Sequence, residues 1–134
     1  MYEFDPDEKL VRTWALLTRG QCSVQLSMAV DTGCSQTVLA EAAITTLTYD
    51  GPGTPVTIVT GGGAITGSVL TVDKFSALGR EVEHYEVQVC DLPAALGVDG
   101  LLGLDFFKGK LLTFDFANGY LRLDDPEWPP LPSS

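Results

Sequence analysis

The sequence is poor in positive charge, in histidine and in cysteine, and it contains no long hydrophobic run. Its 134 residues include 8 Lys and Arg against 18 Asp and Glu, which gives a net charge of −10. So acidic a surface repels phosphate backbones and anionic lipids, and we therefore expect no nucleic-acid and no membrane partner. No apolar run approaches the roughly 20 residues that span a bilayer. The acidic N-terminus also lacks the apolar stretch of a secretory signal.

The three cysteines and the single histidine provide little for a metal site or a disulfide framework. Cys22, Cys34 and Cys90 are odd in number and widely spaced. We therefore expect reduced thiols, no metal, no cofactor and a cytoplasmic location. A length of 134 residues with 45% apolar residues fits one folded domain with a sizeable core.

Two-residue alternation of apolar and polar side chains dominates the chain and is typical of strands with one buried face. It predicts strands near residues 22–30, 84–89 and 112–116, and turn and hairpin signals add strands near 14–18, 56–59, 65–72 and 121–123. Helical periodicity is confined to residues 41–47, about two turns, and 104–108, about one turn. The pattern predicts an all-β fold, either a small barrel or a sandwich, with the Trp and Phe side chains in its core.

Three short motifs stand out at the ends of predicted strands. Asp31-Thr32-Gly33 follows an apolar strand, Leu101-Leu102-Gly103 precedes the second helical segment, and a glycine run at residues 61–63 lies at a hairpin tip. Each motif alone has an ordinary structural interpretation: an Asx turn, a buried strand before a helix, and a flexible turn. Their combination and order are more informative than any one of them.

The ordered set resembles the retropepsin-like aspartic proteases, the clan of retroviral-type and small bacterial single-domain enzymes. The resemblance runs from about residue 14 to residue 123. It implies a small closed acid-protease barrel with one or two short helices. It also implies an N-terminal extension at residues 1–12, a retropepsin-like domain at 13–124 and a Pro-rich tail at 125–134.

The resemblance also assigns expected roles to individual residues. Asp31 would be the catalytic carboxylate, with Thr32 bracing the two loops across a dimer and Gly33 giving its N–H to the carboxylate. The predicted support beneath the loop is Leu101, Leu102 and Gly103, and the predicted substrate-binding flap is Thr60, Gly61, Gly62, Gly63 and Ala64. The sequence differs from most relatives in having Cys34 after the motif, where oxidation would provide an off-switch.

The chemistry of aspartic proteolysis requires two carboxylates that share one proton, because like charges in close contact do not both ionise. This chain has one Asp-Thr-Gly, so one chain supplies half a site. We therefore expect a two-fold homodimer that hydrolyses a peptide or protein substrate, with an acidic optimum.

Other interpretations stay open at this point. The same fold can serve as a catalytically weak or inactive dimerisation or peptide-binding module. Cys34 and His84 are a conceivable nucleophile and base, whereas Ser35, in Gly33-Cys34-Ser35-Gln36-Thr37, lacks the second glycine of a nucleophile elbow. The glycine run lacks the Lys-Ser/Thr of a phosphate loop. Structural roles are expected for Asp105 and Asp115.

Overall fold

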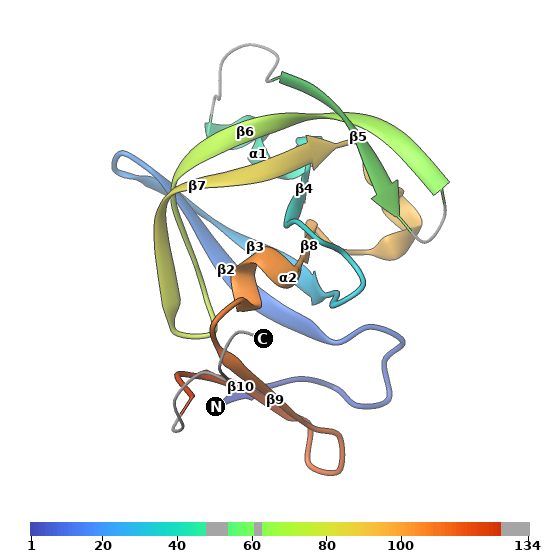
Figure 1. Ribbon diagram of the computed structural model, residues 1–134, viewed down its shortest axis with the longest axis vertical. Helices are drawn as coiled ribbons and strands as arrows, with labels where there is room; N and C mark the ends of the chain where they lie inside the picture. Colours follow the sequence, from blue (N-terminus) through green and yellow to red (C-terminus); the bar gives the residue numbers. More distant parts are fainter. Residues whose placement is uncertain (48–53, 61–62, 127–134) are drawn as a thin grey trace, which may run out of the picture.

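The chain folds into a closed six-stranded barrel with a smaller three-stranded sheet at one end (Figure 1). The computed structural model describes residues 1–47, 54–60 and 63–126. In chain order, the elements are β1 (Tyr2–Glu3), β2 (Arg12–Arg19), β3 (Cys22–Val30), β4 (Val38–Ala40), α1 (Glu41–Ile44), the 3-10 turn η1 (Thr45–Leu47), β5 (Thr54–Thr60), β6 (Gly63–Ala77), β7 (Arg80–Cys90), the 3-10 turn η2 (Ala94–Leu96), β8 (Gly100–Leu102), α2 (Leu104–Phe107), β9 (Leu111–Asp115) and β10 (Tyr120–Asp124).

The barrel closes because β6 pairs with strands on two sides. Neighbouring strands follow the order β2-β3-β8-β4-β7-β6, and β6 then pairs back with β2. The first half of β6 forms a hairpin with β5, and its second half pairs with β7 and β2. The β3–β8 and β4–β7 pairs are parallel, and the other barrel pairs are antiparallel. The all-β closed barrel with two short helices, predicted from the sequence, is confirmed.

The strands β4 and β8 are packed on both faces. On β4, Val38 and Leu39 are each 0% exposed, although consecutive strand residues point to opposite faces. Val38 belongs to one apolar cluster, with Leu101, and Leu39 belongs to another, with Leu102. A Cβ on Gly100 would lie 2.4 Å from the Val38 carbonyl oxygen, so the two strands approach closely only because residue 100 has no side chain. Because β8 is packed on both faces, it is a rigid support for the loop that follows β3, whose Asp31 N–H it accepts at Leu102.

Among the residues that the structure describes, the expectation that Trp and Phe side chains lie in the core is wrong for Trp14 and Phe116. Trp14 is 62% exposed and Phe116 is 59% exposed. On β2, Ala15 and Leu17 face the core, so Trp14 points outward on the opposite face. Both faces of this strand carry apolar residues, and periodicity alone does not choose between them.

The small sheet joins the two ends of the described chain. β1 pairs with β10, which pairs with β9, and the Phe4 side chain that follows β1 is buried in the core. The hairpin predicted at Asn118-Gly119 is present as the β9–β10 turn. Within the three described ranges, no helix is long and apolar enough to cross a bilayer. Most of the predicted Pro-rich tail, residues 127–134, lies outside the described residues.

Candidate active site

Asp31 occupies the first position of a tight turn at the end of β3. Its backbone N–H donates to the Leu102 carbonyl oxygen at 2.9 Å, and its own carbonyl oxygen accepts the Cys34 N–H at 3.1 Å. The Gly33 N–H donates to Asp31 Oδ1 at 3.0 Å. Backbone and side chain of the partly buried Asp31 are therefore both held.

The rest of the Asp31 carboxylate is uncommitted. Within the described residues, the carboxylate accepts one hydrogen bond, from the Gly33 N–H. A Cβ added to Gly33 would lie 3.2 Å from Asp31 Oδ1, so a larger residue there would crowd the carboxylate. Thr32 is exposed, and its hydroxyl has no hydrogen-bond partner in the described part of the chain. The described residues also contain no group of three or more His, Cys, Asp or Glu that could hold a metal ion. The turn thus presents one carboxylate and one hydroxyl with unused hydrogen-bonding capacity.

The segment that runs from β8 into α2, which contains Leu101-Leu102-Gly103, lies against this turn. Leu101, Leu102 and Gly103 are all buried. The Leu104 N–H donates to the Cys34 carbonyl oxygen at 2.8 Å, and the Asp105 N–H donates to that of Ser35 at 3.2 Å. The unpaired amides at the start of α2 therefore find their acceptors in the Asp31 loop.

Gly103 is the closest point of that contact. A Cβ there would lie 2.7 Å from the Gln36 carbonyl carbon and 2.8 Å from the Cys34 carbonyl oxygen. The glycine adopts φ −97° and ψ −178°, a conformation open to any residue. The lack of space, and not the backbone conformation, requires glycine at this position.

Two residues near the turn were not singled out from the sequence. Thr37 is 0% exposed, and its N–H and its hydroxyl both donate to Asp105 Oδ1 at 2.9 Å. The Tyr85 hydroxyl, on β7, donates to Asp105 Oδ2 at 2.5 Å. Burial raises the pKa of Tyr85, and its hydrogen bond to Asp105 acts in the same direction. Asp105 therefore has the structural role expected of it, but its partners come from distant parts of the sequence.

The predicted flap lies at the end of the β5–β6 hairpin. The last ladder pairs are Val59 with Ala64 and Thr60 with Gly63. Gly63 and Ala64 are exposed. The backbone of Gly63 has φ +123°, a conformation that residues with a side chain rarely adopt. Gly61 and Gly62, at the predicted tip, lie outside the described residues.

The conceivable Cys34–His84 pair has no support in the geometry. Cys34 is buried, and its thiol donates to the Gln36 carbonyl oxygen at 2.9 Å. Burial raises the pKa of Cys34, and the charges of Asp31 and Asp105 add to this effect. His84 is exposed, and no hydrogen bond joins it to Cys34 in the described part of the chain. A thiol with a raised pKa is protonated at neutral pH and is a poor nucleophile.

Thiol reactivity checks this description. Cys22 is exposed, whereas Cys34 and Cys90 are buried and burial raises the pKa of both. Because only the thiolate reacts, we expect iodoacetamide at pH 7.5 to label Cys22 at least about tenfold faster than Cys34 or Cys90. Mass spectrometry of peptides from the briefly treated protein gives the relative labelling rates of the three cysteines. Rapid labelling of Cys34 in the folded protein would contradict the burial of its thiol.

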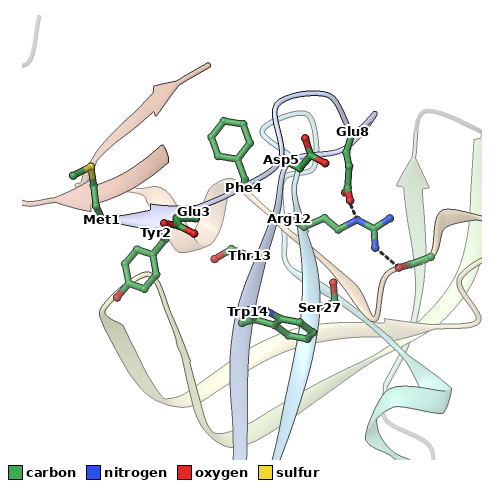
Figure 2. A pocket seen from close by; sticks show the side chains of 11 residues that line it. Met1, Tyr2, Glu3, Phe4, Asp5, Glu8, Arg12, Thr13, Trp14 and Ser27 are labelled. Atoms are coloured by element: carbon green, nitrogen blue, oxygen red, sulfur yellow. Dashed lines mark hydrogen bonds and ion pairs between the residues drawn. The ribbon is translucent and has the colours of Figure 1, made fainter. Parts of the chain in front are cut away.

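An open hollow of about 870 Å³ lies elsewhere, between the N-terminal segment and the outer face of β2 (Figure 2). Tyr2, Phe4 and Trp14 supply its apolar surface, and an ion pair joins Arg12 to Glu8 at 3.0 Å. None of the residues predicted for catalysis, support or the flap lines it. The hollow is therefore separate from the Asp31 turn.

Comparisons with known proteins agree with the architecture of the barrel. A family model described as aspartyl protease matches residues 18–106. A retropepsin-like aspartic protease from Rickettsia conorii has a similar structure, with a TM-score of 0.62 and 21% identity over 92% of this chain and 87% of that chain. The EIAV protease, complexed with the inhibitor HBY-793, matches with a TM-score of 0.58 and 25% identity over 76% of this chain and 88% of that one. Among curated proteins, none matches the sequence significantly. The chain therefore belongs to the aspartyl protease family, and its fold is that of the retropepsin-like members.

Proposed function

We propose that the protein is a homodimeric aspartic endopeptidase in which Asp31 of each subunit meets Asp31 of its partner on a two-fold axis. The observation that carries this proposal is a single, rigidly held carboxylate whose acceptor capacity is mostly unused. A lone carboxylate has no acid partner with which to share a proton, and a second copy of the chain supplies one.

The surface around the turn supports association at this place. Thr32, Gly33 and Ser35 are exposed, and Leu104, whose N–H bonds the Asp31 loop, is 41% exposed. An exposed leucine beside a polar turn is suited to a contact with a second subunit. The free Thr32 hydroxyl is well placed to bond across such a contact, and this is the role that the family resemblance implies for it.

The two carboxylates have different tasks in the proposed reaction. The ionised Asp31 removes a proton from a water molecule, and the resulting hydroxide oxygen forms a bond to the carbonyl carbon of the peptide. The protonated Asp31 of the other subunit gives its proton to the carbonyl oxygen, where negative charge develops. The first carboxyl then protonates the amide nitrogen as the C–N bond breaks. The second carboxylate removes a proton from one hydroxyl of the tetrahedral gem-diol as the new carboxyl group forms. The pair of carboxyl groups thereby returns to its single shared proton.

The flap residues 60–64 would hold the substrate as an extended strand against the barrel. The backbone N–H and C=O groups of a hairpin end bond a peptide main chain in the manner of an added strand. We also propose a cytoplasmic location, which the three unpaired cysteines support.

Mixing active and inactive subunits tests whether the site is shared. We expect a 1:1 mixture of wild type and Asp31→Asn, after subunit exchange, to show about one quarter of the wild-type activity at equal total protein. The reason is that only wild-type pairs, about a quarter of random dimers, contain two carboxylates. Peptide cleavage is measured after pull-down through two different tags has verified the exchange.

Two other outcomes have clear meanings. An activity of about one half in the exchanged mixture would show that each chain works alone, and would overturn the shared site. A stable wild-type dimer without any peptide cleavage would instead favour the peptide-binding or dimerisation module.

A further inference from the structure

Beneath the Asp31 turn, three polar side chains from separate elements form one hydrogen-bonded group that the proposed reaction does not use directly. Thr37 precedes β4, Tyr85 lies on β7, and Asp105 lies in the first turn of α2. Thr37 is 0% exposed, so its hydroxyl depends wholly on protein partners. Such a buried group constrains the segments that contribute to it.

One peptide unit connects this group to the Asp31 backbone. The Leu102 carbonyl oxygen accepts the Asp31 N–H at 2.9 Å. The N–H on the other side of the same peptide bond, that of Gly103, donates to Thr37 Oγ1 at 3.2 Å. Because a peptide unit is planar and stiff, a rotation that breaks one of these hydrogen bonds also disturbs the other.

Asp105 fixes the direction in which the Thr37 hydroxyl points. The Thr37 hydroxyl has one proton, and it donates that proton to Asp105 Oδ1 at 2.9 Å. Its two lone pairs then accept the Gly103 N–H and face the Tyr85 hydroxyl, whose oxygen lies 2.9 Å from Thr37 Oγ1. The Thr37 N–H also donates to Asp105 Oδ1, and the Tyr85 hydroxyl bonds the second carboxylate oxygen. With both of its oxygens occupied, the carboxylate has little freedom to turn.

We propose that Asp105 is a positioning residue for the Asp31 carboxylate, acting through the Thr37 hydroxyl and the Leu102–Gly103 peptide. Its catalytic consequence rests on the proposed function, whereas the mechanical link does not. A carboxylate that must meet its counterpart on a dimer axis tolerates little misplacement, and a displacement of about 1 Å can lower a rate about a hundredfold.

Two substitutions at Thr37 separate positioning from packing. Thr37→Val keeps the shape of the side chain but removes the hydroxyl, whereas Thr37→Ser keeps the hydroxyl and removes a methyl group. We expect Thr37→Val to lower kcat about 10- to 100-fold with KM changed less than about twofold, because the substrate contacts of the flap are untouched. We expect Thr37→Ser to retain kcat within about threefold.

Substitutions of Asp105 and Tyr85, whose side chains both bond Thr37, show which of the two matters more for positioning. Asp105→Asn removes the carboxylate that orients the hydroxyl, and we expect it to lower kcat as Thr37→Val does. Tyr85→Phe removes the hydroxyl that bonds Asp105 Oδ2 and Thr37 Oγ1 but keeps both Thr37–Asp105 bonds and the Gly103 N–H bond to Thr37, so its effect on kcat is expected to be smaller. The Thr37 pair carries the test even if Asp105→Asn does not fold. Circular dichroism and sedimentation of each variant establish that fold and dimer are retained.

Hydrogen exchange tests the link without any activity. In the wild type, the Asp31 amide is bonded to the Leu102 carbonyl. We expect Thr37→Val to speed exchange of the Asp31 amide at least about tenfold, and Thr37→Ser to leave it close to wild type, as measured by NMR. Unchanged exchange in Thr37→Val, or equal acceleration in both variants, would overturn the positioning link.

The measurements of kcat and KM can contradict the catalytic part of the proposal in three ways. An unchanged kcat in Thr37→Val, an equal loss of kcat in Thr37→Ser, or a change confined to KM would each overturn the catalytic part of the inference. A wild-type protein with no Asp31-dependent cleavage would instead reject the proposed function. The exchange rates would still decide the mechanical link.

Discussion

Replacing Asp31 by asparagine is expected to lower peptide hydrolysis at least about a thousandfold while leaving fold and dimer intact. Asparagine has nearly the same shape, and its side-chain oxygen can still accept the Gly33 N–H that Asp31 Oδ1 accepts at 3.0 Å. An amide neither takes a proton from water nor holds the proton that a carboxyl pair shares. Steady-state cleavage of a peptide library, with sedimentation at the same concentration, measures both parts of the prediction.

A matched variant separates this effect from the loss of one negative charge. Asp7 is exposed, and its side chain has no hydrogen-bond or ion-pair partner among the described residues. Asp7→Asn therefore changes the net charge of −10 by the same amount as Asp31→Asn and is expected to retain full activity. Cleavage at the wild-type rate by Asp31→Asn would remove Asp31 from the chemistry. The activity would then need another origin.

The local signals in the sequence were sufficient for the all-β class and for the end of β3, whereas the closed barrel was implied by the family resemblance. Residues 22–30 alternate without interruption, and the strand observed there has those bounds. Asp31-Thr32-Gly33 marks the end of that strand, and Leu101-Leu102-Gly103 occupies β8 and the start of α2 beneath it. The strand and the turn that ends it depend on residues close together in the chain, where periodicity and turn chemistry are informative, whereas the resemblance alone implied that Leu101-Leu102-Gly103 lies beneath the turn.

The polar support of the turn could not be derived in the same way. Thr37, Tyr85 and Asp105 meet only because β4 pairs with β7 and α2 packs against the Asp31 loop. The sequence gives no register for a parallel pair such as β4–β7, so it cannot show that Tyr85 lies beside Thr37. Trp14 shows the related limit for burial, because β2 has apolar residues on both of its faces.

Introducing a single methyl group at Gly103 is expected to have the largest effect on stability of the changes considered. In Gly103→Ala, the new Cβ would lie 2.7 Å from the Gln36 carbonyl carbon and 2.8 Å from each of the carbonyl oxygens of Cys34 and Gln36. All three atoms belong to the backbone, so no flexible side chain can move aside. We expect a loss of about 2–3 kcal/mol in the free energy of unfolding, measured by urea denaturation at fixed protein concentration.

The same substitution is expected to reduce the activity of the molecules that remain folded. Gly103 shares a peptide unit with the Leu102 carbonyl that holds the Asp31 N–H, so a displacement at Gly103 also displaces the catalytic turn. Gly109→Asn is the control, because Gly109 has φ +77° with no atom within 4 Å of an added Cβ, and asparagine tolerates that conformation. We expect the control to unfold within about 0.5 kcal/mol of wild type and to cleave normally. Wild-type stability in Gly103→Ala would mean that the contact between α2 and the Asp31 loop is looser than the three short distances require.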